Sequence, residues 1–106
     1  MQVDIGDYEV VRHIATPECS LRVLRLRKGK SVRPHHHHKT TQIYFVLEGT
    51  AQATLDDQLV VLKPHQVLRV PPEAIHGIGT DGEAIVLSIS IPPLDFTDQH
   101  VAVEHG

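Results

Sequence analysis

Short apolar runs follow one another along the chain, and most of them end at residues that form turns. They lie at residues 21–26, 43–47, 51–55, 59–62, 67–70 and 84–91. Prolines directly follow the fifth and the last of these runs. No stretch of ten or more residues repeats apolar positions at helical spacing. The pattern therefore predicts seven to nine short β-strands and no long helix.

The runs at 43–47 and 51–55 are separated by a segment that contains Glu48 and Gly49, a turn-forming pair. This spacing predicts that the two runs pair as a β-hairpin. Many short strands form closed barrels or double-sheet jelly rolls, and such barrels can hold a small ligand. We therefore expect a single all-β domain over residues 1–106.

Charge argues against a nucleic-acid partner. The formal net charge is −3, whereas phosphate binding needs a clustered basic surface. The most basic stretch, residues 22–33, intersperses Lys and Arg with Val and Leu. This predicts a strand with a solvated basic face. Arg25 and Arg27 are alternatively candidates to enter a pocket and hold an anionic substrate.

No apolar stretch is long enough to cross a bilayer, so no membrane partner is expected. Residues 1–16 contain acids and no apolar run, which argues against a secretory leader. Cys19 is the single cysteine and cannot form an internal disulfide. Such a chain suits a reducing compartment, and a cytoplasmic location is the expectation.

Histidine is the unusual feature of the composition: nine are present, and four stand together. Residues two apart on a strand share a face, so His35 and His37 point one way and His36 and His38 the other. Two imidazoles at this spacing can hold one metal ion with ligands from elsewhere, for which His76 is a candidate. The alternatives are an exposed loop of histidines and a shifted pair, His36 and His38.

Gln42 opens a strand face that it shares with Tyr44 and Val46, and a polar residue there suits a pocket. Tyr44 is the candidate catalytic residue, because its hydroxyl can donate a proton or bind an oxyanion. Packing inside a barrel is the alternative role. Ser88 and Ser90 also share a face, which is turned either to the cavity or to solvent.

The chain resembles the cupin superfamily over residues 29–49. The first cupin motif is a glycine, five residues, His-x-His, four residues, an acid, six residues and a glycine. Gly29, His35, His37 and Gly49 match it at every spacing. Gln42 stands where the motif has its acid, usually Glu.

Residues 65–80 correspond to the second cupin motif. Pro71 and His76 match it, and Thr80 replaces an asparagine. His65 and Glu73 replace two turn glycines. Because glycine usually provides the positive φ of such turns, we expect these two turns to take a different shape.

The resemblance implies a cupin barrel, also called a double-stranded β-helix or jelly roll. It also implies one divalent transition metal ion bound by His35, His37, Gln42 and His76. A neutral Gln42 leaves the ion its full positive charge, and its amide NH₂ then needs an acceptor. The ligand types suit Zn, Ni, Fe, Co, Cu or Mn. In the alternative, Gln42 does not coordinate and three histidines hold the ion.

Cupins include dioxygenases, decarboxylases and sugar isomerases. We expect a metal-dependent enzyme acting on a small organic molecule. Oxygenase-type chemistry is favoured, because a sugar isomerase or epimerase also needs a positioned base. A non-catalytic protein that binds or senses a small molecule or metal is the main alternative, and a purely structural metal ranks last. The resemblance also implies a homodimer, with residues 8–14 as a pairing edge strand.

Overall fold

The computed structural model describes residues 6–101, and they form a structure that is nearly all β. The strands are β1 (Glu9–Ala15), β2 (Ser20–Arg27), β3 (Val32–His36), β4 (Thr41–Gly49), β5 (Ala51–Leu55), β6 (Gln58–Leu62), β7 (Val67–Val70), β8 (His76–Gly79), β9 (Glu83–Ile91) and β10 (His100–Val101). A single 3-10 turn, η1 (Phe96–Asp98), precedes β10. Ten strands exceed the predicted seven to nine. Two of them, β3 and β10, are short and carry few apolar residues.

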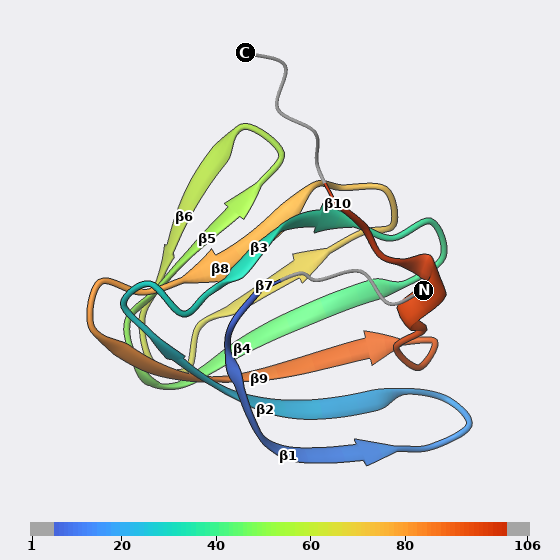
Figure 1. The fold of residues 1–106 in the computed structure, drawn as a ribbon, viewed down its shortest axis with the longest axis horizontal. Helices are drawn as coiled ribbons and strands as arrows, with labels where there is room; N and C mark the ends of the chain where they lie inside the picture. Colours follow the sequence, from blue (N-terminus) through green and yellow to red (C-terminus); the bar gives the residue numbers. More distant parts are fainter. Residues whose placement is uncertain (1–5, 102–106) are drawn as a thin grey trace.

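Two antiparallel five-stranded sheets face each other (Figure 1). The first has the order β1-β2-β9-β4-β7 and the second the order β10-β3-β8-β5-β6. From β2 onward the chain crosses between the sheets at almost every connection, β5 to β6 being the exception. This winding is the double-stranded β-helix, and it confirms the predicted fold class.

The hairpin expected from 43–47 and 51–55 is wrong. β4 lies in the first sheet between β9 and β7, and β5 lies in the second sheet between β6 and β8. Both edges of β4 are therefore already paired. Gly49 has φ of +76° at the end of β4, and the chain there crosses to the other sheet. The hairpin forms one strand later, between β5 and β6, around Asp56 and Asp57.

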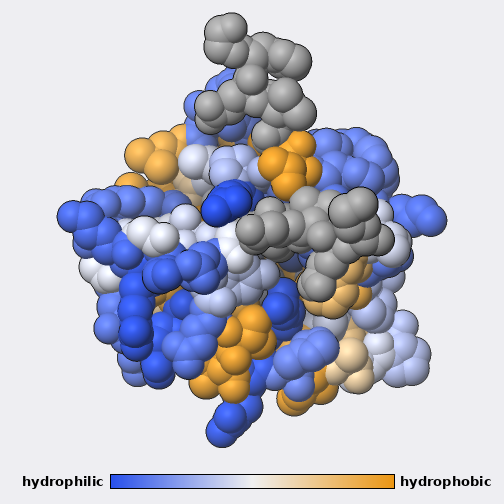
Figure 2. Space-filling model, viewed as in Figure 1, coloured by the Kyte–Doolittle hydropathy of each residue, from blue (hydrophilic) through white to orange (hydrophobic). Residues whose placement is uncertain are grey.

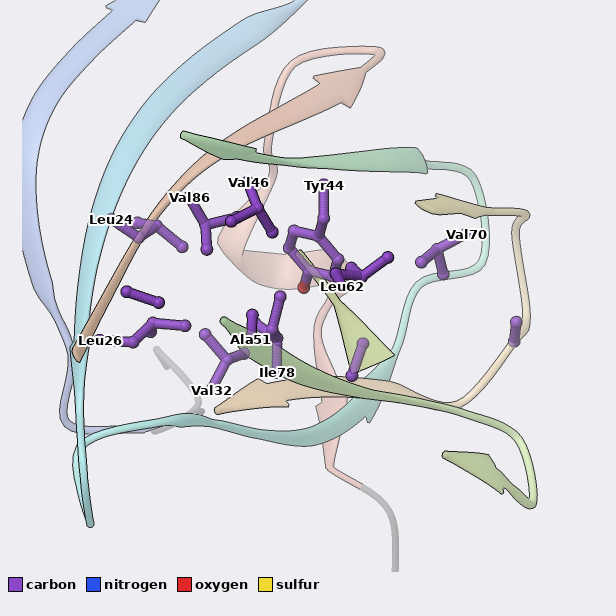
Figure 3. Close-up of a cluster of buried hydrophobic side chains, with 13 residues drawn as sticks. Leu24, Leu26, Val32, Tyr44, Val46, Ala51, Leu62, Val70, Ile78 and Val86 are labelled. Atoms are coloured by element: carbon purple, nitrogen blue, oxygen red, sulfur yellow. The ribbon is translucent and has the colours of Figure 1, made fainter. Parts of the chain in front are cut away.

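The core lies between the two sheets, where inward side chains of both sheets meet (Figure 3). On β4 the buried side chains are Gln42, Tyr44 and Val46, while Ile43 and Phe45 on the other face are only half-buried. The face of β4 that carries both polar and apolar residues is thus the one turned to the barrel interior, as the polar residue at its start suggests. Aliphatic side chains fill the end of the barrel near Leu26 and Val86.

The two turns that lack the motif glycines keep the glycine-like conformation. His65 has φ of +71° and Glu73 has φ of +74°. The expectation of a different turn shape is wrong, because pairing of the flanking strands imposes the backbone geometry. His65 lies between β6 and β7, and its amide donates to the carbonyl of Val46. Glu73 lies between β7 and β8, and its amide donates to the carbonyl of His37.

The outer surface is mixed. Figure 2 shows one face on which hydrophilic residues predominate and hydrophobic residues form separate patches. Among the residues described, no helix has the length and apolar character that crossing a membrane requires.

Candidate metal centre

The four consecutive histidines divide between the interior and the outside of the barrel. His35 is 1% exposed and His37 is 2% exposed. His36 is half-buried on the opposite face, and His38 is exposed. β3 ends at His36, and the alternation of His35 and His36 continues through His37 and His38. The structure thus brings His35 and His37 together in the interior and places the alternative pair, His36 and His38, on the outer side.

His76 joins these two histidines from the neighbouring strand. It begins β8, and its Cα lies opposite that of His35 in the β3–β8 pairing. The ring centroids of His35 and His76 are 4.3 Å apart, those of His35 and His37 are 4.8 Å apart, and those of His37 and His76 are 5.2 Å apart. One ring nitrogen from each lies within 4.8 Å of the others. The group can hold a metal ion.

Backbone carbonyls determine which nitrogen each ring presents. The Nδ1 atoms of His35, His37 and His76 lie 2.7, 2.7 and 2.9 Å from the carbonyl oxygens of Arg33, Asp98 and Ala74. A carbonyl oxygen only accepts hydrogen bonds, so each Nδ1 carries the proton and each Nε2 keeps its lone pair. His37 Nε2 is buried without a hydrogen-bond partner among the described residues.

Gln42 faces the same point from β4. Its Oε1 lies 2.6 Å from His76 Nε2, and its Nε2 donates to Ser90 Oγ at 3.1 Å. Ser90 thus provides the acceptor that the amide NH₂ requires. Because His76 Nδ1 carries the ring proton, His76 Nε2 and Gln42 Oε1 bring two lone pairs together. A cation would relieve their repulsion, so this donor set fits a metal ion.

Burial keeps the three imidazoles neutral. It lowers the pKa of His35 to about 3, with a further contribution from His76. Burial likewise lowers the pKa of His76 to about 4 and lowers the pKa of His37. Metal ions bind the neutral imidazole, so at neutral pH these side chains are already in the binding form.

Tyr44 lies in the core beside this group. Its side chain is 1% exposed, and its hydroxyl lies 3.5 Å from Gln42 Oε1. Burial raises the pKa of Tyr44. The phenol is therefore neutral and can donate a hydrogen bond, which is the protonation state that the expected role requires.

A cavity of about 10 Å³ adjoins His35 and has room for about one water molecule. Its lining includes His35, Gln42, Tyr44, Ser88, Arg22 and Gln99. The two serines predicted to face either the cavity or solvent are both buried, Ser88 being 5% exposed and Ser90 1% exposed. The cavity wall is thus more polar than an aliphatic barrel would be.

The basic residue beside the cavity is Arg22. The alternative that Arg25 and Arg27 enter the pocket is wrong, because both line an outer groove with Asp7, Glu9 and Lys30. Arg22 shares the inward face of β2 with Leu24 and Leu26, two residues apart each time. The expectation of a solvated basic face therefore fails at this position. The guanidinium of Arg22 donates to the Tyr8 hydroxyl at 3.3 Å.

Sequence reasoning also missed Gln99 and Asp98. Gln99 is 2% exposed, and both polar atoms of its amide are buried without a partner among residues 6–101. Asp98 supplies the carbonyl that accepts from His37. Both follow the last long strand, some sixty positions after the histidine run. No motif in the sequence signals that the chain returns to the barrel there.

Comparison with known proteins agrees with this architecture. Residues 22–91 match the model of the cupin domain. The chain is 30% identical over 71 residues to a mannose-1-phosphate guanylyltransferase of Sinorhizobium fredii, covering 67% of this chain and 14% of that protein. It is 32% identical over 59 residues to a gentisate 1,2-dioxygenase of Haloferax, covering 56% of this chain and 16% of that protein. The chain thus spans about a sixth or less of these two relatives.

Solved structures show the same fold. The structure of KdgF from Halomonas superposes with a TM-score of 0.74 at 22% identity, covering 84% of this chain and 88% of that one. The family match extends over most of the barrel, from β2 to the end of β9, and includes both histidine segments. The chain therefore belongs to the cupin family.

Proposed function

We propose that the protein is a metal-dependent enzyme that acts on a small organic molecule, with oxygenase-type chemistry. In this proposal His35, His37, His76 and Gln42 hold one divalent transition metal ion. The observation that carries it is the convergence of three buried, neutral imidazoles, each with Nδ1–H donated to a backbone carbonyl. Such donation orients a ligating imidazole and raises its basicity.

A bound ion would supply a Lewis acid that polarises an oxygen atom or activates water or dioxygen. The protein's own groups bind and orient. Ser90 holds the Gln42 amide so that Oε1 is turned toward His76. Tyr44 adds a neutral hydroxyl at the same oxygen. The Tyr44 hydroxyl is thus placed as a hydrogen-bond donor.

The cavity lining supports a substrate with an anionic or enolic oxygen. Arg22 provides a positive charge at the cavity wall, and Gln99 provides an amide with no other partner in the described part of the chain. The existing volume of about 10 Å³ suits a molecule as small as water or dioxygen. An organic substrate requires some of the lining side chains, which include Tyr8 and Leu94, to move outward.

The Haloferax relative supports the oxygenase reading, since its name is that of a dioxygenase. The isomerase alternative has less support. No carboxylate lines the cavity in the described structure, and the one histidine on its wall is His35, a proposed ligand. A reaction that moves protons between carbon atoms needs a base at that place.

The absence of a carboxylate from the cavity lining in the described structure also favours a second candidate function. This candidate is a cupin that binds a small molecule or metal without turnover. The two candidates share the metal ligands and the cavity. They differ only in whether a bound substrate is converted.

The test begins with elemental analysis of untagged protein, wild type and His76→Ala, after dialysis against iron(II), zinc or nickel. The expected result is an ion in the wild type that depends on His76. Oxygen uptake is then measured with iron-loaded protein and gentisate as the probe. Uptake by the wild type but not by His76→Ala supports an oxygenase.

An ion that depends on His76 without oxygen uptake, over gentisate and a panel of small diketones, favours the binding protein. If the wild type binds no ion that depends on His76, the metal proposal is overturned. Tyr44→Phe separates the roles further. We expect it to retain the ion and to lose activity about 10- to 100-fold.

A further inference from the structure

A second group of metal-ligating side chains lies on the outside of the barrel, across β3 from the buried histidines. Its members are His36, His38, His100, Glu73 and Asp98. His36 points outward from β3, and His100 lies opposite it in the β3–β10 pairing. The C-terminal segment thus brings a third imidazole to two members of the histidine run.

The three outer rings lie close together. The ring centroids of His38 and His100 are 4.1 Å apart, those of His36 and His100 are 5.1 Å apart, and those of His36 and His38 are 5.3 Å apart. Ligand atoms of His36, His38 and Glu73 all lie within 4.8 Å of one another, and so do those of His38, Asp98 and His100. His38 belongs to both sets and is the centre of the group.

Glu73 orients His38. Its Oε1 accepts a hydrogen bond from His38 Nδ1 at 2.8 Å, which leaves the Nε2 lone pair free for another partner. Glu73 has φ of +74°, a conformation that residues other than glycine rarely adopt. The chain therefore places a carboxylate beside His38 at a position where the backbone favours glycine.

Asp98 fixes the loop that carries His38. Its two carboxylate oxygens accept from the backbone amides of His38 and Lys39 at 2.9 and 3.0 Å. Asp98 Oδ1 also lies 3.3 Å from His100 Nε2.

The group contains an unpartnered buried nitrogen. His36 Nδ1 is buried and has no hydrogen-bond partner among the residues that the structure describes. Glu73 and Asp98 bring carboxylate oxygens to the same group of imidazoles. A divalent cation accepts lone pairs from both ligand types, and imidazole with carboxylate suits zinc or copper.

We propose that His38 and His100, assisted by His36 and by the carboxylates of Glu73 and Asp98, form a second site for a divalent transition metal ion. The ion would join the loop after β3 to β10. Gln99, the neighbour of His100, lines the cavity beside His35. The outer ion would therefore hold the segment that brings Gln99 to the cavity wall. The proposal does not depend on the buried site.

The experiment measures zinc stoichiometry and affinity by equilibrium dialysis and elemental analysis of untagged, chelator-treated protein. The wild type is compared with His38→Ala, His100→Ala and His76→Ala. His13→Ala is the matched control, because His13 is an exposed histidine on β1, in the other sheet from β3 and β10. Glu73→Gly removes the carboxylate while relieving the backbone strain, so its folding is not in question.

We expect two ions in the wild type and in His13→Ala, and one ion in His38→Ala and in His100→Ala. Glu73→Gly is expected to lower the affinity for one of the two ions about 10- to 100-fold. His76→Ala should keep the outer ion, so its result reports on the buried site alone. Two ions of unchanged affinity in His38→Ala, or a single wild-type ion that His76→Ala abolishes, would overturn the proposal.

Discussion

At the scale of single residues, the buried histidines owe their chemistry to backbone carbonyls rather than to other side chains. Arg33, Asp98 and Ala74 each accept Nδ1–H from one ring. As a result, the Nε2 lone pairs of His35, His37 and His76 all point into the barrel interior. This arrangement also explains why burial can be tolerated, because each ring satisfies its one donor internally.

Gln42→Glu tests whether the amide is a ligand. The change adds a negative charge beside the proposed ion, so we expect zinc to bind about tenfold tighter, about 1.4 kcal/mol. In the metal-free protein a buried carboxylate next to neutral imidazoles is unfavourable, so the melting temperature should fall. Calorimetric titration with zinc and thermal unfolding provide the two measurements.

Gln58→Glu is the control for that experiment, because Gln58 is exposed on β6 and adds the same charge far from the buried histidines. It should leave the affinity of the buried ion unchanged. Equal affinities in Gln42→Glu and the wild type would mean that Gln42 does not contact the ion.

Acid should destabilise the metal-free protein. His35 and His76 have pKa values of about 3 and about 4 in the folded state, against 6.5 for the unfolded chain. The unfolded chain therefore binds more protons between pH 4 and 6.5, and stability falls as pH falls through this window. The upper limit is about 1.4 kcal/mol per pH unit for each group.

Urea unfolding of chelator-treated protein at a series of pH values measures this effect. His35→Asn, which has no group that titrates in this range, should flatten the profile. A midpoint that stays constant from pH 7 to pH 4.5 would contradict the expected burial of neutral imidazoles.

At the scale of elements, several crossings between the two sheets contain a residue with positive φ. Gly49 is the clearest case, because a Cβ there would lie 2.1 Å from the carbonyl oxygen of Glu83 on β9. Gly29, with φ of +80°, has open space around the corresponding position. The two glycines share a backbone conformation and differ in steric surroundings.

This difference predicts unequal effects of alanine. Gly29→Ala should cost about 1–2 kcal/mol, the price of the left-handed conformation alone. Gly49→Ala should cost more, about 3 kcal/mol or above, because β9 must also move. Chemical denaturation of both variants gives the comparison, with Gly82→Ala as a control in open space. Equal losses would show that the β4–β9 contact is not tight.

At the scale of the whole molecule, the outer face of the first sheet is rich in apolar side chains. Cross-strand pairing aligns Val23, Leu87, Phe45 and Val67 in one row over β2, β9, β4 and β7. Val67 is 55% exposed, and Ile14 on the edge strand β1 is 59% exposed. Homodimerisation stays a prediction, and its support is this face together with the position of β1 as the end strand of its sheet among the described residues.

A dimer through this face would be broken by Leu87→Glu, because the charge would be buried in the contact. Multi-angle light scattering should give about twice the chain mass of 11.8 kDa for the wild type and the single mass for the variant. Leu59→Glu is the control, since Leu59 is 67% exposed on β6 in the other sheet. A monomeric wild type at high concentration would contradict the prediction.

Local sequence determined most of the strands and the inward histidines. Extended backbone through residues 35–37 places His35 and His37 on one face, because its side chains point to opposite sides in turn, although β3 itself ends at His36. The polar start of β4 likewise marked Gln42 and Tyr44 as interior positions. These properties depend only on neighbours along the chain.

Features that depend on pairing between distant segments were decided by the tertiary structure. β4 and β5 lie in different sheets, and the backbone has a positive φ at His65 and Glu73. Arg22 lies at the wall of the cavity. The tertiary structure also returned the C-terminal segment to β3, which brought Gln99 to the cavity and His100 to the outer histidines. No local pattern encodes these contacts, because they arise only when both sheets close on one core.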